Sequence, residues 1–137
     1  MPRTFILDTS AIYALISSSD KFHAEAIDVY LHLIDGGDDL RTTSYVLVEV
    51  SALVHRRLGF QPLKDIFDSI SGVLDIYWVD RSTHEEAWRR MVDRGGAKLS
   101  FVDWSIIVAA EHIRSTIFTF DQEFARQGLS VVPFKVY

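Results

Sequence analysis

The sequence of 137 residues contains no cysteine, which excludes disulfides, thiolate catalysis and cysteine-ligated zinc sites. It also lacks any run of about 20 apolar residues, the length that a helix needs to cross a bilayer. The residues after Met1 lead directly into a predicted strand, without the apolar segment of a signal peptide. These three absences predict a soluble protein of the reducing cytoplasm, with no membrane partner.

A surplus of basic residues is missing as well, since 14 Lys and Arg stand against 19 Asp and Glu and give a net charge of −5. No basic stretch therefore marks the chain as a nucleic-acid binder, although an acidic site that recruits a divalent cation can reverse its local charge. The sequence also has no glycine-rich phosphate loop, no G-x-S-x-G nucleophile motif and no H-E-x-x-H zinc motif. Three common kinds of hydrolytic site are thereby excluded.

Apolar residues are plentiful, at 48% of the chain, and they form strand-like and helix-like segments in alternation. Short apolar runs predict five strands, namely Thr4–Leu7, Leu40–Thr43, Val73–Val79, Thr116–Phe120 and Leu129–Val132. Helical spacing predicts the segments between them, namely Thr9–Ile16, Phe22–Ile34, Ser44–Leu58, Pro62–Ile70, Ser82–Arg94, Ser100–Ile113 and Gln122–Arg126. The alternation predicts one α/β domain over residues 1–137, with three layers and a mostly parallel twisted sheet.

Two local predictions concern the helices expected from Ser82 and from Ser100. The segment Ser82-Thr83-His84-Glu85 has the spacing of a capping box, so it predicts the start of that helix. Trp88 and Trp104 lie on the apolar faces of their helices, and we expect both indoles in the core.

Four acidic residues lie where the predicted strands and helices meet turns or the edge of the core, namely Asp8, Glu49, Asp103 and Asp121. Asp8 and Asp121 each follow a strand and precede a helix, so each has an ordinary explanation as a helix N-cap. The carboxyl ends of parallel strands are also where open α/β sheets place their ligands. The position alone is thus compatible with a cap and with a binding site.

Glu49 and Asp103 have two explanations in the same way. Glu49 lies at the border of the apolar stripe of its helix, from which it can reach water or point into a cleft. Asp103 has capping-box spacing with Ser100 but opens an almost wholly apolar helix, where burial raises a carboxyl pKa unless a cation compensates. Carboxylates brought together repel one another, and an all-oxygen set of ligands favours Mg²⁺ or Mn²⁺ over zinc.

At these residues the sequence resembles the PIN domain family, and more narrowly the VapC-type toxin ribonucleases of type II toxin–antitoxin systems. The resemblance extends from Ile6 to Val132 and depends on four segments in order: Asp8-Thr9-Ser10-Ala11, Val46–Leu53 around Glu49, Leu99–Asp103 and Thr119–Phe124. It implies a central parallel sheet between helices, with the acids gathered at one edge.

The resemblance implies a metal-dependent endoribonuclease that hydrolyses RNA phosphodiester bonds, leaving 5′-phosphate and 3′-hydroxyl ends, as the toxin of a toxin–antitoxin pair. Asp8, Glu49 and Asp103 would be the principal ligands of one or two Mg²⁺ or Mn²⁺ ions. Asp121 would be an outer ligand or a ligand of a second ion. The implied partners are RNA, a cognate antitoxin and a second copy of the chain in a homodimer.

Other side chains near the acids are candidates for supporting roles. We expect hydroxyl groups to orient the carboxylates or a bound water, namely those of Thr9, Ser10 and Ser100. Basic side chains close to the acids in the sequence are candidates for binding RNA phosphates, namely Arg94, Lys98 and Arg126.

Alternative functions use the same fold. One is a PIN-domain ribonuclease of RNA processing outside any toxin pair, and another is a non-catalytic binding module. A structure-specific DNA nuclease on a related fold would carry long insertions, for which 137 residues leave little room.

Overall fold

The sheet at the centre of the molecule has five parallel strands in the order β3-β2-β1-β4-β5. The computed structural model describes residues 2–95 and 98–133. The strands are β1 (Thr4–Leu7), β2 (Asp39–Thr43), β3 (Asp75–Tyr77), β4 (Thr116–Phe118) and β5 (Val131–Val132). The predicted α/β class and parallel sheet are confirmed.

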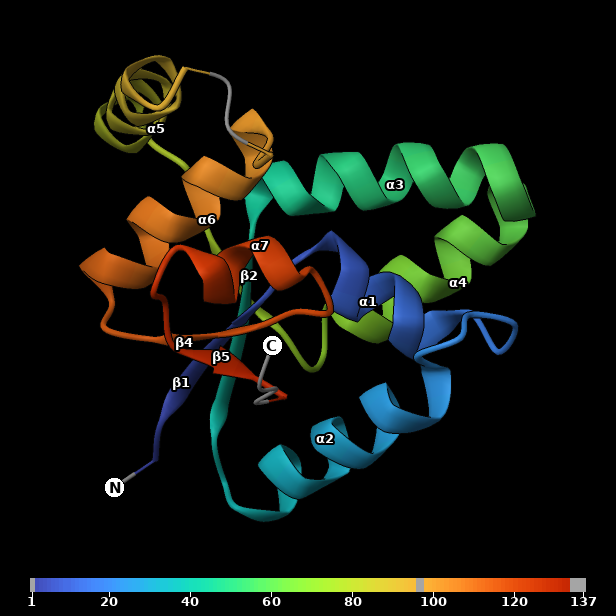
Figure 1. Cartoon of the computed structure of the whole chain (residues 1–137). Helices are drawn as coiled ribbons and strands as arrows, with labels where there is room; N and C mark the ends of the chain where they lie inside the picture. The colour runs from blue at the N-terminus through green and yellow to red at the C-terminus, as the bar shows by residue number, and fades with distance from the viewer. Residues whose placement is uncertain (1, 96–97, 134–137) are drawn as a thin grey trace.

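Helices connect the strands and cover both faces of the sheet. They are α1 (Thr9–Ile16), α2 (His23–Asp35), α3 (Ser44–Leu58), α4 (Phe60–Ile70), α5 (Arg81–Asp93), α6 (Phe101–His112) and α7 (Gln122–Arg126). Figure 1 shows α1 to α4 to the right of the strands and α5 and α6 to the left, which gives the expected three layers. Within the described ranges, no helix combines the length and apolar character needed to cross a membrane.

Strand β1 lies in the middle of the sheet and explains why the acids come together. Its residues Phe5, Ile6 and Leu7 are completely buried, as a strand covered on both faces must be. The register pairs Leu7 with Phe118 of β4, and the amide of Asp8 donates to the carbonyl of Phe118 at 3.1 Å. Asp8 therefore stands beside the residue that follows β4.

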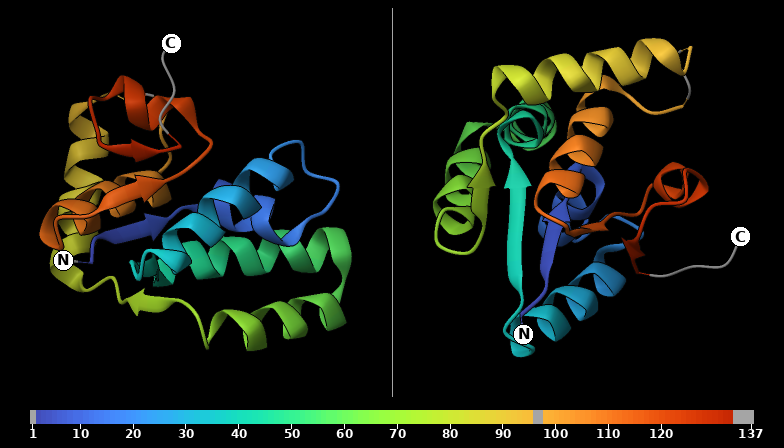
Figure 2. Two further views of the ribbon diagram at one scale, coloured as in Figure 1. Left: turned by 90° about the horizontal axis from the view of Figure 1, so that it is seen from below. Right: turned by 90° about the vertical axis from the view of Figure 1, so that its left-hand side faces the viewer.

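The carboxyl ends of the strands face one edge of the molecule, where α1, α3 and α6 begin. In Figure 1 this edge is at the top, where the start of α6 approaches the start of α3. The right view in Figure 2 shows β1 and β2 side by side and pointing in the same direction. Since each parallel strand ends at this edge, the residues after the strands share one region.

Several predicted boundaries differ from the structure, and one predicted cap is wrong. Helix α5 begins at Arg81 and its N-cap is Asp80, whose side chain accepts from the amide of Thr83, so Ser82 does not cap it. Asp and Ser are both good N-caps, and Asp80 allows the helix to begin a residue earlier. The strands β3, β4 and β5 are shorter than predicted, and α4 begins at Phe60 rather than Pro62.

The prediction that Trp88 lies in the core is wrong, whereas Trp104 is buried as expected. Helix α5 packs through Thr83 and Ala87, both buried, and the next position along the helix turns away from the core. Trp88 is 52% exposed, and its ring lies 5.5 Å from that of Phe101. It covers the start of α6 rather than filling the interior.

Candidate functional site

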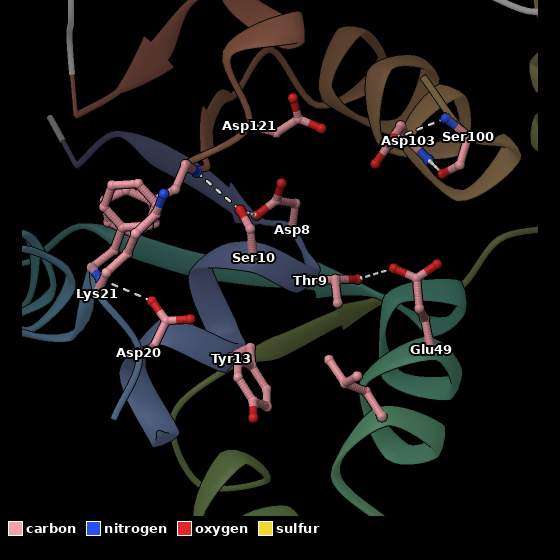
Figure 3. Close-up of a pocket in the computed structure, with 13 residues that line it drawn as sticks. Asp8, Thr9, Ser10, Tyr13, Asp20, Lys21, Glu49, Ser100, Asp103 and Asp121 are labelled. Carbon is pink, nitrogen blue, oxygen red and sulfur yellow. Dashed lines mark hydrogen bonds between the residues drawn. The ribbon is translucent and has the colours of Figure 1, made fainter. Parts of the chain in front are cut away.

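A pocket of about 500 Å³ lies at the carboxyl edge of the sheet and is lined by all four predicted acids. Figure 3 shows Asp8 near the centre, Asp121 above it, and Asp103 and Glu49 to the right. All three hydroxyl residues expected near the acids also line this pocket, namely Thr9, Ser10 and Ser100. Residues from four separate parts of the sequence are thus brought into one cavity.

Asp8 is the most enclosed of the four acids, because it directly follows the buried strand β1. It is 3% exposed and forms the N-cap of α1, where its Oδ1 accepts from the amide of Ala11 at 2.9 Å. The hydroxyl of Ser10 donates to the same oxygen at 2.7 Å, and that of Thr119 donates to Oδ2 at 2.5 Å. The N-cap explanation is therefore correct, and it places the carboxylate in the pocket.

Burial raises the pKa of Asp8 from 3.8 to about 7, and the neighbouring charge of Asp103 adds to the effect. The hydrogen bonds from Thr119, Ala11 and Ser10 favour the charged form but do not offset the loss of solvent. At neutral pH the metal-free protein therefore holds this carboxyl partly protonated. A cation in the pocket would favour the charged form.

Two hydroxyl groups connect the loop after β4 to Asp8. The amide of Asp121 donates to Thr119 Oγ1 at 2.9 Å, and this hydroxyl in turn donates to Asp8. The amide of Phe120 donates to Ser10 Oγ at 2.9 Å, and that hydroxyl also donates to Asp8. Thr119, whose role the sequence did not reveal, thus fixes the position of Asp121 relative to Asp8.

Glu49 reaches the pocket from helix α3, whose buried face consists of Val46, Val50 and Val54. The residue lies at the border of this face and is half-buried, as the helical periodicity predicted. Its Oε1 accepts a hydrogen bond from the hydroxyl of Thr9 at 2.5 Å. This bond connects the start of α1 to α3 across the mouth of the pocket (Figure 3).

Asp103 is held at the start of α6 by a complete capping box. Ser100 Oγ accepts from the amide of Asp103 at 3.1 Å, and the carboxylate of Asp103 accepts from the amide of Ser100 at 2.9 Å. Burial raises the pKa of Asp103, and the charges of Asp121 and Glu49 raise it further. Both acids act on Asp103 through their charge, so the members of the cluster interact as like charges.

Asp121 lies on the same edge as the N-cap of the short helix α7, where its Oδ1 accepts from the amide of Glu123 at 3.0 Å. It is half-buried, and Figure 3 shows its carboxylate above that of Asp8. Both aspartates thus cap a helix that follows a strand, but the repetition is not exact, because β4 ends at Phe118 and Thr119 and Phe120 separate it from Asp121.

The chemistry of these residues fits a hard divalent cation, because the donors are all carboxylate and hydroxyl oxygens. A buried carboxyl with a raised pKa and like charges around it is the setting that such a cation compensates. The carboxylates of Glu49 and Asp103 are turned toward Thr9 and Ser100 instead. Within residues 2–95 and 98–133, no three acidic or histidine side chains are placed to hold one ion together.

The three basic residues predicted to contact RNA do not line the acidic pocket and lie apart from one another. Arg94 lines a separate hollow with Trp104 and Glu111, whereas Lys98 is exposed two residues before Ser100. Arg126 forms an ion pair with Glu123 on α7. The basic residue that does line the acidic pocket is Lys21, on the connection between α1 and α2.

The capping box at Ser100 gives a direct test of how the α6 end of the pocket is supported. Ser100→Ala removes the oxygen that accepts from the amide of Asp103, so we expect it to lower the free energy of unfolding by about 1 kcal/mol. Urea unfolding would measure the change, and Ser100→Thr, which keeps a hydroxyl cap, should recover most of it. Equal stability of Ser100→Ala and the unmodified protein would contradict this role.

Comparison with known proteins places this pocket in a recognised fold. The sequence profile of the PIN domain matches residues 5–128. Mycobacterium tuberculosis VapC20, described as a sarcin-ricin loop cleaving toxin, is 23% identical, with a TM-score of 0.80 over 91% of this chain and 95% of that one. No protein of curated function matches the chain by sequence.

One chain in each of two VapBC structures has a similar fold. VapBC2 from Rickettsia felis, bound to a DNA fragment from its promoter, is 15% identical, with a TM-score of 0.73 over 96% of this chain and 99% of that one. M. tuberculosis VapBC-5 is 18% identical, with a TM-score of 0.59 over 98% and 100% of the two chains. At these identities the likeness shows a shared fold. The sequence match spans most of the chain, which therefore belongs to the PIN domain family.

Proposed function

We propose that this protein is a metal-dependent endoribonuclease and the toxin component of a toxin–antitoxin pair. The observation that carries the proposal is the pocket in which Asp8, Glu49, Asp103 and Asp121 meet at the carboxyl edge of a PIN-domain sheet. Burial raises the pKa values of Asp8 and Asp103, and neighbouring carboxylate charges add to the effect, so the assembly of the acids is costly without a cation. A site built only of oxygen donors favours Mg²⁺ or Mn²⁺.

In this proposal Asp8, Glu49 and Asp103 hold the metal and Asp121 binds at its outer side or holds a second ion. A bound metal would supply a water of lowered pKa and neutralise charge on the phosphate oxygens. The carboxylates of Glu49 and Asp103, which accept from the Thr9 hydroxyl and the Ser100 amide, would be among those that hold it. The hydroxyls of Ser10 and Thr119 keep the Asp8 carboxylate in a fixed orientation.

A phosphodiester substrate fits the same chemistry, since it would bring negative charge to a site that a metal would make positive. The choice of RNA is supported by the resemblance to VapC toxins, of which VapC20, with the same fold, is described as a sarcin-ricin loop cleaving toxin. Arg94, Lys98 and Arg126 stay candidates for contacts to phosphates further along the strand. Of these, Lys98 is nearest in sequence to Ser100 and Asp103.

A protein antitoxin and a second copy of the chain are the proposed partners. Support for the antitoxin comes from the similar folds of the two VapBC proteins, one of them described as a member of a family of toxin–antitoxin systems, whereas the homodimer rests on the family resemblance alone. An antitoxin-like reading frame directly upstream of the gene would favour the toxin over a ribonuclease of RNA processing. Light scattering at micromolar concentration should give the mass of a homodimer, and a monomer would contradict that part of the proposal.

The test of the proposed activity is cleavage of total cellular RNA by the purified protein with Mn²⁺, Mg²⁺ or EDTA. We expect cleavage with either metal, products that carry 5′-phosphates, and complete loss of cleavage with EDTA. Restoring Mn²⁺ in excess after EDTA should restore the activity. Cleavage that persists in EDTA would overturn the metal-dependent proposal, and metal binding without cleavage of any RNA would favour a binding module.

A further inference from the structure

The acidic pocket extends beyond the carboxylates to a second end with opposite charge. Besides the four acids, its lining includes Tyr13 of α1 and Lys21 and Phe22 from the connection between α1 and α2. In Figure 3, Lys21 lies on the left of the pocket, opposite Asp103 and Ser100 on the right. A volume of about 500 Å³ is within the range of pockets that hold small ligands, so it has room for more than a cation.

Lys21 is held at this end by aromatic rings. Its Nζ lies 4.9 Å from the centre of the Phe22 ring, which in turn stacks on the Phe120 ring at 4.7 Å with 9° between the planes. The turn itself is fixed because Oδ1 of Asp20 accepts from the amide of Phe22 at 2.9 Å. The ammonium group is thus placed over a rigid stack that joins the α1–α2 connection to the loop carrying Asp121.

Arg57 brings a second cation to the same end from the last turn of α3. Its guanidinium carbon lies 5.2 Å from the centre of the Tyr13 ring, and Tyr13 lines the pocket. A hydrogen bond from Arg57, helped by one from Ser17, lowers the pKa of the Tyr13 hydroxyl. Arg57 is therefore engaged with a residue of the pocket wall rather than directed away from it.

Neither cation is neutralised by a carboxylate in the described part of the chain. Seven other basic residues form salt bridges there, but Lys21 and Arg57 form none. Lys21 lines the pocket itself, and Arg57 lies against its wall at Tyr13. Asp20 also lines this end, where its Oδ1 accepts from the backbone amide of Phe22, so two cations and one carboxylate leave this end with a net positive charge in a protein of net charge −5.

We infer that Lys21 and Arg57 form a phosphate-binding subsite for the RNA backbone, on the Tyr13 side of the carboxylates. The inference rests on the proposed ribonuclease function and adds where the strand lies: one phosphate at the acids, and the phosphate of a neighbouring nucleotide at Lys21 and Arg57. Lys contributes a point charge and Arg a planar set of donors, and both are common partners of phosphate. The subsite also gives the strand a path across the pocket, from the acids toward Lys21.

The test measures binding of a fluorescein-labelled single-stranded RNA of ten nucleotides by fluorescence anisotropy over a range of salt concentrations. It is performed with Mg²⁺ in an Asp103→Asn background, in which cleavage is not expected. Each lost phosphate contact should reduce the slope of log affinity against log salt by about 0.7, so Lys21→Ala and Arg57→Ala should each reduce it by that amount. Arg56→Ala is the matched control, because Arg56 carries the same charge at the preceding position of the same helix, whereas it is Arg57 whose guanidinium lies against the Tyr13 ring of the pocket wall.

The outcomes separate this inference from the proposed activity. In the unmodified background, Lys21→Ala should raise KM several-fold and leave kcat nearly unchanged, the pattern of a lost binding contact. Reduced slopes for Lys21→Ala and Arg57→Ala without cleavage by any form would support the subsite and contradict the nuclease. Slopes equal to that of Arg56→Ala, or no binding of RNA by the parent protein, would overturn the subsite even if cleavage occurs.

Discussion

Asp8→Asn is expected to reduce metal-dependent cleavage of RNA by about a thousandfold or more. A divalent cation contributes several kcal/mol of charge stabilisation in the transition state, and each 1.36 kcal/mol lost corresponds to a tenfold lower rate. The amide has the shape of the carboxylate and can still accept from the amide of Ala11, so the cap of α1 should persist. What the substitution removes is the negative charge in the most enclosed part of the pocket.

Asp103→Asn should reduce the rate of RNA cleavage by a similar factor, because it removes a second proposed metal ligand. Asp121→Asn should cost less, about tenfold, as expected for a residue that acts from the outer side of the metal. Asp28→Asn, the same chemical change at an exposed position of α2 outside the pocket, is the matched control. Initial rates on one RNA substrate with Mn²⁺ would measure all four, and full activity of Asp8→Asn or Asp103→Asn would refute the site assignment.

The substitution Asp8→Asn should also make the protein without bound metal more stable at neutral and alkaline pH. The pKa of Asp8 is about 7 in the folded protein, compared with an ordinary value of 3.8, so folding favours the protonated carboxyl. This contribution to stability is fully present below about pH 4 and is lost as the pH rises through 7. At 1.36 kcal/mol for each pKa unit, the loss amounts to about 4 kcal/mol by pH 8.

Asn cannot ionise, so the free energy of unfolding of Asp8→Asn should exceed that of the unmodified protein by a margin that grows between pH 4 and pH 7. Urea unfolding in EDTA at several pH values would measure this margin, with Asp28→Asn as the control that changes little. Mn²⁺ at saturating concentration should stabilise the unmodified protein and reduce the difference, because the ion binds only the folded site. A margin independent of pH would show that Asp8 is not the buried titrating group.

The acids could be predicted from the sequence because each lies at a junction that is local in the chain. Asp8 and Asp121 follow apolar strands, and Asp103 follows Ser100 at capping-box spacing, so short segments were enough to find them. Parallel strands then place these junctions at the same edge of the sheet, as the structure confirms. The helical periodicity of α3 placed Glu49 at the border of the core for the same local reason.

Contacts between distant segments could not be predicted in this way. The bond from Thr119 to Asp8 spans 111 positions and depends on β4 lying next to β1 with Leu7 opposite Phe118. Lys21 enters the pocket because the α1–α2 connection folds back onto Phe120, which no periodicity of the sequence indicates. Trp88 was misplaced because α5 packs through its small residues Thr83 and Ala87, and a large residue at the edge of such a face stays exposed.

Three of the four acids lie in the first turn or at the cap of a helix, namely Asp8 at α1, Asp103 at α6 and Asp121 at α7. The amide groups at a helix N-terminus carry partial positive charge, so the macrodipoles of α1 and α6 both present their positive ends to the carboxylates. The backbone therefore offsets part of the repulsion that the side chains create. On the proposed function, a cation would then bind to carboxylates that the folded backbone already holds together.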